Sequence, residues 1–220
     1  MNNKQYDDIF NVALLEGARF EGDFDLPVIE RTDSIPDKIT PFDKAMSAKD
    51  FNSYVHFFIN DGSFARIWSN PFRYLPVIAK FKGALAVDFS IAWPYPLFIN
   101  LESVARSRTI GSWLQRSGVD VIPVARWGLP NTYGFAFDGI ASGGTVAVGT
   151  TGCTKNPEAR KIFAKGLPEL IRRVEPKALI VYGPFREDVF QPALNSGTII
   201  KHFDSDTTLA KNRGRSNGTD

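Results

Sequence analysis

Short apolar runs alternate with helix-like stretches along most of the chain. Six runs end abruptly at a polar or glycine-rich turn; they span residues 54–59, 84–87, 119–124, 145–148, 178–181 and 198–202. Short apolar runs bounded by turn residues, several of them rich in β-branched residues or Phe, are typical of buried strands. Because helical segments separate most of the runs, the pattern predicts a single α/β domain with a mostly parallel sheet of about six strands and flanking helices, open or barrel-like.

Two intervening segments carry clear helix signals. Residues 101–118 end at Gly118, a residue suited to the left-handed turn that closes a helix, and we expect the arginines of this helix to face water. A second helix is expected to begin at Asn156, a capping residue that precedes Pro157 at the first helical position. These two helices would therefore serve as crossover connections between successive parallel strands.

The pattern also predicts how the domain is divided. Residues 1–50 contain isolated apolar positions and Pro-broken loops, and we interpret them as an arm packed on the core. The α/β core spans residues 51–205, in which residues 63–81 should form two short helices because prolines interrupt them. Residues 206–220 are small and polar without periodicity, so we expect a flexible tail.

Composition narrows the class of protein. Of the 220 residues, 43% are hydrophobic and 23% charged, which argues against a disordered chain. No apolar run approaches the roughly 18 residues that span a bilayer, and the amino terminus lacks signal-peptide features, so we expect a cytoplasmic protein with no membrane partner. One cysteine excludes an intramolecular disulfide, and two histidines limit any zinc site. The net charge of +2 argues against a dedicated nucleic-acid binder but leaves room for a local basic patch.

Polar side chains follow the first two runs. If the strands are parallel, their carboxyl ends share one edge of the sheet, here called the carboxyl edge, where ligands bind in open α/β sheets and α/β barrels. Asp61 follows the first run, and Asp88 and Ser90 follow the second. Either carboxylate could act as a general base or hold a cation such as magnesium. Asp61 could instead cap a helix, and the aromatic loop after Ser90 could cover the core rather than stack on a ligand.

Arg126 and Trp127 stand at the end of the third run. An always-charged guanidinium at the end of a buried strand needs a carboxylate, carbonyl or phosphate partner. Two interpretations stay open for Arg126: contact with a ligand, or an internal salt bridge to Asp61 or Asp88. Tyr182, at the end of the fifth run, could donate to the same ligand or close the core.

The fourth run leads into a turn of small residues, 149–155. Backbone N–H groups around Thr150 and Thr151, the helix amino terminus and Lys155 would together favour an anion, although an ordinary strand-to-helix turn explains the same residues. The G-x-x-x-x-G-K-[ST] spacing of a phosphate-binding loop is absent. Cys153 in this turn is a nucleophile only if a base lies beside it, and the alternative is a buried inert thiol.

Arg106 and Arg108 lie two residues apart in the helix expected over residues 101–118. They could clamp a phosphate at the carboxyl edge or simply form a solvated face. Together with Arg116 and either Lys80 or Lys82, they could also form a surface footprint for nucleic-acid phosphates.

Five blocks of the chain resemble the DUF4417 family: VHFFINDGSFARIWSNPFRYL, GALAVDFSIAWPYP, SRTIGSWLQRSGVDVIPVARW, FDGIASGGTVAVGTTG and PKALIVYG. The resemblance covers roughly residues 20 to 203. That family comprises uncharacterised proteins of bacteria, their phages and mobile elements. The resemblance therefore implies a cytoplasmic accessory protein, and it supplies no catalytic residue set to carry over. The polar and glycine positions that recur in the family pattern are Asp61, Asp88, Ser90, Arg106, Arg108, Gly111, Arg126, Trp127, Gly139 and Gly183.

These observations lead to three hypotheses. The first is a pocket at the carboxyl edge that binds or hydrolyses an anionic small molecule, such as a nucleotide or phosphorylated metabolite. Asp61 and Asp88 would be its acid–base or magnesium-binding groups. The residues expected to contact the ligand are Ser90, Arg106, Arg108, Arg126, Trp127, Thr150, Thr151, Lys155 and Tyr182. The second is a nucleic-acid-binding accessory protein, and the third a non-enzymatic host-interaction protein that uses the aromatic stretch 93–96. One sequence does not determine the oligomeric state.

Overall fold

A computed structural model describes residues 8–92, 94–153 and 156–209. Seven parallel strands form its centre, and their order in space follows their order in the chain. They are β3 (Ile39–Pro41), β4 (Tyr54–His56), β5 (Gly83–Leu85), β6 (Val121–Ile122), β7 (Thr145–Gly149), β8 (Ala178–Tyr182) and β9 (Ile199–Phe203). The first four pair as one sheet and the last three as another, and a single parallel bridge between Val124 and Ala147 joins the two.

The α/β fold with parallel strands is confirmed, and all six expected runs contain a strand. The seventh strand, β3, does not correspond to any of the six apolar runs. It lies within residues 1–50, the segment expected to be an arm, and it pairs with β4 at the edge of the sheet. Its three residues end in Pro41, a residue that an edge strand tolerates. A three-residue strand beside prolines has too few alternating apolar positions to be predicted from the sequence.

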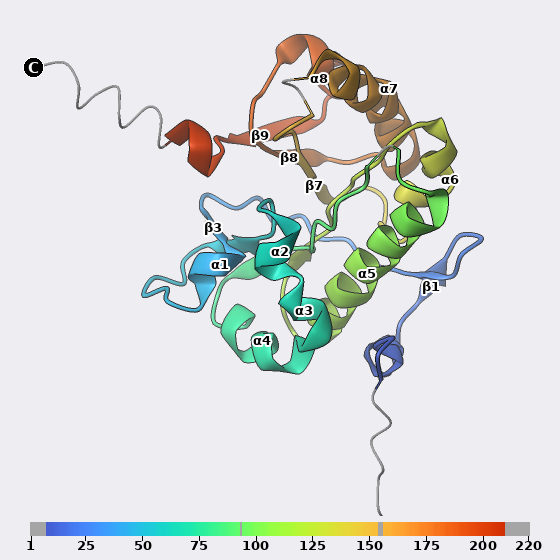
Figure 1. Ribbon diagram of the computed structural model, residues 1–220. Helices are drawn as coiled ribbons and strands as arrows, with labels where there is room; N and C mark the ends of the chain where they lie inside the picture. The colour runs from blue at the N-terminus through green and yellow to red at the C-terminus, as the bar shows by residue number, and fades with distance from the viewer. Residues whose placement is uncertain (1–7, 93, 154–155, 210–220) are drawn as a thin grey trace, which may run out of the picture.

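The two sheets curl toward each other without closing into a barrel. In a flat sheet, β4 and β8 would lie four strand spacings apart, about 19 Å. The Tyr182 ring, however, lies 4.7 Å from the His56 ring and 5.2 Å from the Phe58 ring, between ring centroids. Figure 1 shows β7, β8 and β9 above the elements that surround β3. The curl brings the carboxyl ends of distant strands close together.

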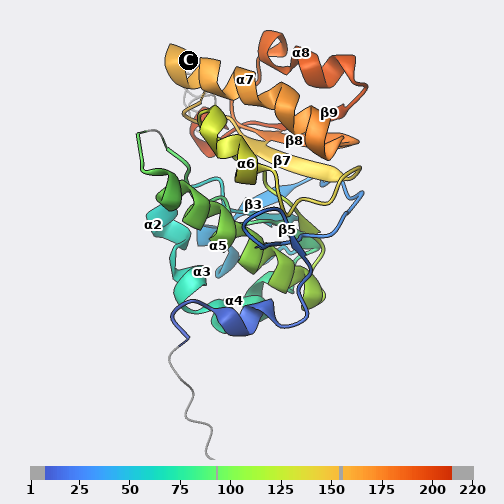
Figure 2. The ribbon, with the colours of Figure 1, turned by 90° about the vertical axis from the view of Figure 1, so that its right-hand side faces the viewer.

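Helices cover the outside of both sheets (Figure 2). In the described residues these are α1 (Phe42–Ala45), α2 (Asp61–Phe64), α3 (Arg66–Ser69), α4 (Pro71–Ile78), α5 (Leu97–Arg116), α6 (Tyr133–Ala136), α7 (Pro157–Val174) and α8 (Glu187–Asn195). Two short 3-10 turns, η1 (Val12–Leu15) and η2 (Pro130–Thr132), and one antiparallel pair, β1 (Phe20–Glu21) with β2 (Leu26–Pro27), complete the fold. Figure 2 shows α7 and α8 on the outer side of β7–β9.

Local signals set several helix ends. The side chain of Asn156 caps α7 by accepting a hydrogen bond from the Glu158 N–H, as its position before Pro157 predicted. Residues 61–78 form three short helices rather than two, because Pro71 begins α4 instead of ending a helix. No helix of the described residues is long and apolar enough to cross a membrane.

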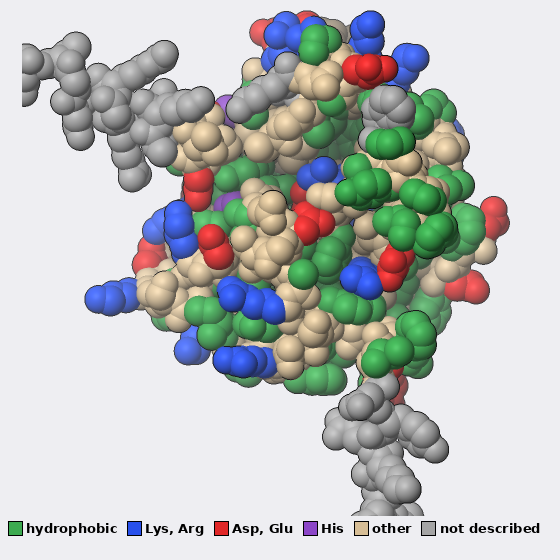
Figure 3. All heavy atoms as spheres, viewed as in Figure 1, with side chains coloured by type: hydrophobic (Ala, Val, Ile, Leu, Met, Phe, Trp, Pro, Cys, Tyr) green, Lys and Arg blue, Asp and Glu red, His purple; other side chains and the backbone are tan. Residues whose placement is uncertain are grey.

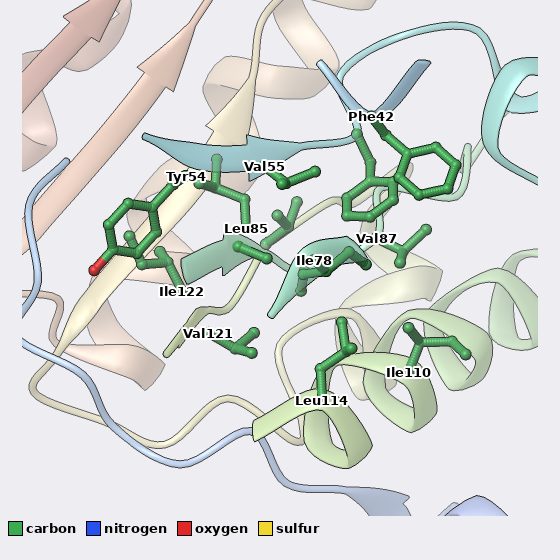
Figure 4. Close-up of a cluster of buried hydrophobic side chains, with 14 of the residues drawn as sticks. Phe42, Tyr54, Val55, Ile78, Leu85, Val87, Ile110, Leu114, Val121 and Ile122 are labelled. Atoms are coloured by element: carbon green, nitrogen blue, oxygen red, sulfur yellow. The ribbon is translucent and has the colours of Figure 1, made fainter. Parts of the chain in front are cut away.

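Two hydrophobic clusters hold the layers together. The larger one joins β4, β5 and β6 to α4 and α5, and Figure 4 shows Ile110 and Leu114 of α5 among side chains of these strands. The second lies between α7, α8 and the outer face of β7 and β8. After β9, residues 206–209 are helical although we expected a flexible tail there; residues 210–220 lie outside the described residues.

Candidate functional site

A cleft of about 980 Å³ opens at the carboxyl edge. Every one of the seven parallel strands leads into at least one residue that lines it. The polar lining is Asp43, Asn60, Asp61, Ser63, Asp88, Ser90, Glu102, Ser103, Arg106, Arg126, Thr151, Tyr182, Ser205, Asp206 and Thr207, together with Tyr95. Figure 3 shows acidic and basic side chains together in the hollow between the two halves of the molecule. The polar ends of the strands therefore meet at one place, as parallel pairing predicted.

Asp88 and Arg126 form an ion pair at the centre of the cleft. The Arg126 Nε donates to Asp88 Oδ1 at 2.6 Å, and its Nη2 donates to Oδ2, so the pair is bidentate. The Asp88 side chain is 3% exposed, whereas that of Arg126 is 25% exposed. Burial alone would lower the pKa of Arg126, but the charge and hydrogen bonds of Asp88 outweigh burial and raise it. Of the two interpretations of Arg126, the salt bridge to Asp88 is thus present, and the guanidinium still lines the cleft.

Asp61 and Ser90 form a second pair in the cleft. The Ser90 hydroxyl donates to Asp61 Oδ1 at 2.8 Å, and the Ser90 N–H donates to Oδ2 at 3.0 Å. The capping role that Asp61 could have filled belongs to Asn60, whose side chain accepts a hydrogen bond from the Gly62 N–H. Asp61 is therefore free to tie the loop after β5 to the start of α2.

Arg106 lies on the side of the cleft formed by α5. Its Nη2 donates to Glu102 at 2.6 Å, and its guanidinium lies 5.0 Å above the Trp68 ring. The side chain is 34% exposed. Arg106 thus lines the cleft as a paired and stacked cation, and its helical neighbour Glu102 brings an acidic group beside it.

Aromatic rings form the floor of the cleft. The rings of Phe58 and Tyr182 stack at an interplanar angle of 13°, and the Tyr182 hydroxyl accepts a hydrogen bond from the Asp206 N–H. His56 lies against Tyr182 and is 1% exposed; burial lowers its pKa to about 4, so the ring is neutral at physiological pH. Tyr182 therefore closes the core and also lines the cleft, and donation by its hydroxyl to a ligand stays a prediction.

The turn after β7 reaches the cleft through only part of its length. Gly149 and Thr151 line the cleft, and a Cβ on Gly149 would lie 2.9 Å from Phe58 Cδ1, so the close approach of these strands needs glycine there. Thr150 is buried, and its hydroxyl donates to the carbonyl oxygens of Tyr182 and Pro184. Lys155 lies outside the described residues.

Cys153 has the properties of an inert thiol. Burial raises its pKa, although the nearby Arg126 charge acts in the opposite direction. Its sulfur lies 3.8 Å from the Gly149 carbonyl oxygen. A raised thiol pKa disfavours the thiolate that a nucleophile needs.

Arg108 and Trp127 do not lie at the cleft, which corrects the expectation that they contact a ligand there. Arg108 is 1% exposed, and its guanidinium donates to the carbonyl oxygens of Val124, Ala136 and Asp138. Its position also corrects the expectation that the arginines of this helix face water. The Trp127 indole stacks on Phe163 of α7 and donates to the Phe163 carbonyl oxygen.

Sequence reasoning missed three acidic residues of the cleft: Asp43, Glu102 and Asp206. Asp43 follows β3, a strand too short to be recognised, and Asp206 fell within the expected tail. The sixth apolar run could have identified Asp206, because this residue follows the carboxyl end of that run. Glu102 carries no local signal, since it reaches the cleft from the side of a helix.

The arrangement is suited to holding a polar molecule by hydrogen bonds and charge. Within the described parts of the chain, no three His, Cys, Asp or Glu side chains are grouped to hold a metal ion. The two carboxylates expected to hold magnesium, Asp61 and Asp88, are bonded to Ser90 and Arg126. This donor set does not fit a magnesium site of protein ligands, because the oxygens of both carboxylates already accept hydrogen bonds from the protein.

Comparisons with known proteins give the family context. The family model of DUF4417, described as "Domain of unknown function (DUF4417)", matches residues 18–204. The chain is 36% identical over 167 residues to the Gene 1 protein of Mycobacterium phage L5, covering 74% of this chain and 72% of that protein. It is 39% identical over 132 residues to the Gene 1 protein of Mycobacterium phage D29; the match covers 60% of this chain and about half of that relative, 49%. No solved structure matches. The matches confirm the resemblance, and these two relatives are phage proteins.

Proposed function

We propose that this chain, which belongs to the DUF4417 family, binds a small molecule with an anionic group in the cleft at the carboxyl edge. The observation that carries the proposal is the convergence of all seven strand ends on one cleft, with a guanidinium at its centre. Ligands of open α/β sheets bind at this edge. The volume of about 980 Å³ lies within the range of small-molecule sites.

Arg126 is the residue that contacts the anionic group. Its Nε and Nη2 are engaged by Asp88, and no hydrogen bond to its Nη1 occurs among the described residues. A quarter of its side chain is exposed, so one edge of the fork is available to a phosphate or carboxylate oxygen. The exposed Thr151 lines the same cleft and offers a hydroxyl. A nucleotide or phosphorylated metabolite would present its phosphate to these two residues.

Binding has more support than hydrolysis. A hydrolase would use Asp61 and Asp88 as acid–base groups, but Asp88 is held in its ion pair and Asp61 by Ser90. Both carboxylate oxygens of Asp88 accept hydrogen bonds from Arg126, so neither is directed at a ligand in the cleft. Magnesium-assisted hydrolysis of a nucleotide stays a prediction, and incubation of nucleotides with the protein, with and without magnesium, tests it.

The binding proposal is tested by thermal-shift screening and calorimetric titration against nucleotides and sugar phosphates, with and without magnesium. We expect at least one of these anions to raise the melting temperature. The Arg126→Gln variant should raise the Kd of that anion at least tenfold, and Thr151→Val, which keeps the side-chain volume, about threefold. Arg186→Gln is the matched control, because Arg186 forms an ion pair with Asp188 on the surface, outside the cleft.

Three results would contradict the proposal. The first is that no anion in the screen stabilises the protein. The second is that Arg186→Gln weakens binding as much as Arg126→Gln does. The third applies if Arg126→Gln unfolds the protein: Thr151→Val then leaves the Kd of the anion unchanged. The circular dichroism spectrum and melting temperature of Thr151→Val should match those of the parent chain.

A host-interaction protein is a second candidate, and one observation favours it. Tyr95, Leu97 and Phe98 are 55%, 43% and 67% exposed at the start of α5. Figure 3 shows hydrophobic side chains gathered over this end of the molecule. Of the expected aromatic stretch 93–96, Trp93 lies outside the described residues. Crosslinking through a photoreactive residue at position 98 in host cells tests this function, and an absence of specific crosslinks would count against it.

Nucleic-acid binding has less support. Among the cations expected to form a footprint, Arg106 is paired with Glu102, and Arg116 donates to the carbonyl oxygens of Leu14 and Glu16. Arg108 is buried. A complex held by phosphate contacts weakens steeply as the salt concentration rises. Nucleic-acid binding that shows this dependence, measured at two salt concentrations, would support this candidate.

A further inference from the structure

The lining of the cleft carries more acidic than basic side chains. Five carboxylates and two guanidiniums line it, which leaves a formal charge of −3. The carboxylates are Asp43, Asp61, Asp88, Glu102 and Asp206, and the guanidiniums are Arg106 and Arg126. A ligand with only negative charge would therefore enter acidic surroundings, apart from the one contact that Arg126 offers.

Three of the five carboxylates have cationic partners. The pairs are Asp88 with Arg126, Glu102 with Arg106 at 2.6 Å, and Asp206 with Lys44 at 3.1 Å. Lys44 does not line the cleft. Within the described residues, Asp43 and Asp61 form no ion pair. The cleft thus contains two carboxylates that form no salt bridge, although the charge of Asp61 lies close enough to Arg126 to contribute to the raised pKa of that guanidinium.

The unpaired carboxylates lie on adjacent strand ends. Asp43 is in the first turn of α1, directly after β3, and Asp61 is in the first turn of α2, after β4. These two strands are neighbours in the sheet. Arg126 follows β6, which is two strands beyond β4 and three beyond β3. Along a flat edge the end of β6 would lie about 10 Å from that of β4 and about 14 Å from that of β3, and closer in a curled sheet.

We infer that the ligand is zwitterionic: its anionic group contacts Arg126, and an ammonium or guanidinium group contacts Asp43 and Asp61. This inference rests on the proposed function, which supplies the position of the anionic group. A ligand that fills the cleft removes water from both carboxylates. Asp61 keeps its two hydrogen bonds from Ser90, but neither carboxylate has a salt bridge, and a carboxylate without water is stabilised by an opposite charge. A cationic group on the ligand provides this opposite charge, whereas a nucleoside triphosphate would add negative charge beside Asp43 and Asp61.

The test uses three probes of matched shape: 4-aminobutyl phosphate, which carries both charges, butyl phosphate and butylamine. Each is titrated into the full chain and followed through the NMR signals of the backbone amides of Ser90 and Thr151. We expect 4-aminobutyl phosphate to bind with a Kd at least tenfold lower than that of butyl phosphate. Asp43→Asn should raise its Kd at least threefold, and the double variant Asp43→Asn, Asp61→Asn should raise it to that of butyl phosphate.

The control is Asp188→Asn, which removes an exposed carboxylate paired with Arg186 and should leave all three Kd values unchanged. Because Asp61→Asn also disturbs the bond to Ser90, the single Asp43→Asn variant keeps the test valid if the double variant does not fold. Equal Kd values for the two phosphates would overturn this inference and leave the proposed function in place. Binding of butylamine but of neither phosphate, or no binding of any probe, would overturn both.

Discussion

Arg108 lies in the interior beneath α5 and Arg126 lies in the cleft at the carboxyl edge, and the two arginines have different partners. Arg108 donates from Nε, Nη1 and Nη2 to three backbone carbonyl oxygens, and it lies in no ion pair among the described residues. Arg126 binds one carboxylate, Asp88, and keeps one edge toward the cleft. Arg108 therefore holds three backbone segments together in the interior, whereas Arg126 keeps part of its charge accessible in the cleft.

This difference lies in what each arginine contacts and in how much of its side chain water reaches. The carbonyl of Ala136 ends α6, and those of Val124 and Asp138 belong to the segments before and after it. Arg108 satisfies carbonyls that would otherwise be buried without donors. Burial lowers the pKa of Arg108 to about 10, so it remains charged at neutral pH. Arg126 instead has an acidic partner and a remaining N–H edge, which is the arrangement that a ligand can use.

The largest effect is expected from Arg108→Met. The substitution leaves three buried carbonyl oxygens without donors, at about 1–3 kcal/mol each, and we expect the free energy of unfolding to fall by about 4–5 kcal/mol. Urea denaturation followed by circular dichroism measures the change. Arg108→Lys should recover only part of the loss, because one ammonium does not match the fork that reaches three acceptors. A loss below 1 kcal/mol for Arg108→Met would refute the structural role.

Asp88→Asn should follow, with a loss of about 3 kcal/mol. Removing one partner leaves the other charge poorly compensated, and the 25% exposure of Arg126 limits the cost to the lower end of the range for buried pairs. The double variant Asp88→Asn, Arg126→Gln should lose less stability than the sum of the single variants. Additive losses would show that the two side chains are not coupled, and the comparison with Arg108 would then fail.

His56, buried against Tyr182 beneath the cleft, should make stability depend on pH. The pKa of His56 is about 4 in the folded protein and near 6.5 in the unfolded chain. As the pH falls below 6.5, the unfolded state binds the proton first, so the free energy of unfolding should drop by about 2.5 kcal/mol between pH 7.5 and 4.5. His56→Gln should remove this part of the drop in denaturation curves at both pH values. An unchanged slope in the variant would exclude His56 as its source.

The smallest effect is expected at Arg106. This side chain is 34% exposed, and its ion pair with Glu102 joins residues four apart on a helix, so Arg106→Gln should cost no more than about 0.5 kcal/mol. A loss comparable to that of Asp88→Asn would mean that the rim of the cleft is as tightly coupled as its centre. Chemical denaturation at low and high salt makes the measurement, because only an exposed pair weakens with added salt.

Much of the architecture follows from local pattern. All six apolar runs contain parallel strands, and the Asn156 cap begins α7 where its sequence predicted. The polar residues after β4, β5 and β6 meet in the cleft because parallel strands share one edge. What the pattern did not predict was the side chain direction within a helix: Arg106 reaches the cleft and Arg108, two residues on, enters the core. Residues two apart on a helix point in different directions, so their environments depend on packing partners.

The sequence alone determined the fold class and the edge where polar groups gather, since strand length, helix spacing and turn residues act over a few neighbouring positions. Only the tertiary structure decided which charges are paired. Asp88 pairs with Arg126, which lies 38 residues away in the sequence. Asp43 lies at the cleft because it follows β3, a strand that is held in place by pairing with β4. Ion pairs of this kind form between groups brought together by the curl of the sheet, and that curl is a property of the whole packed chain.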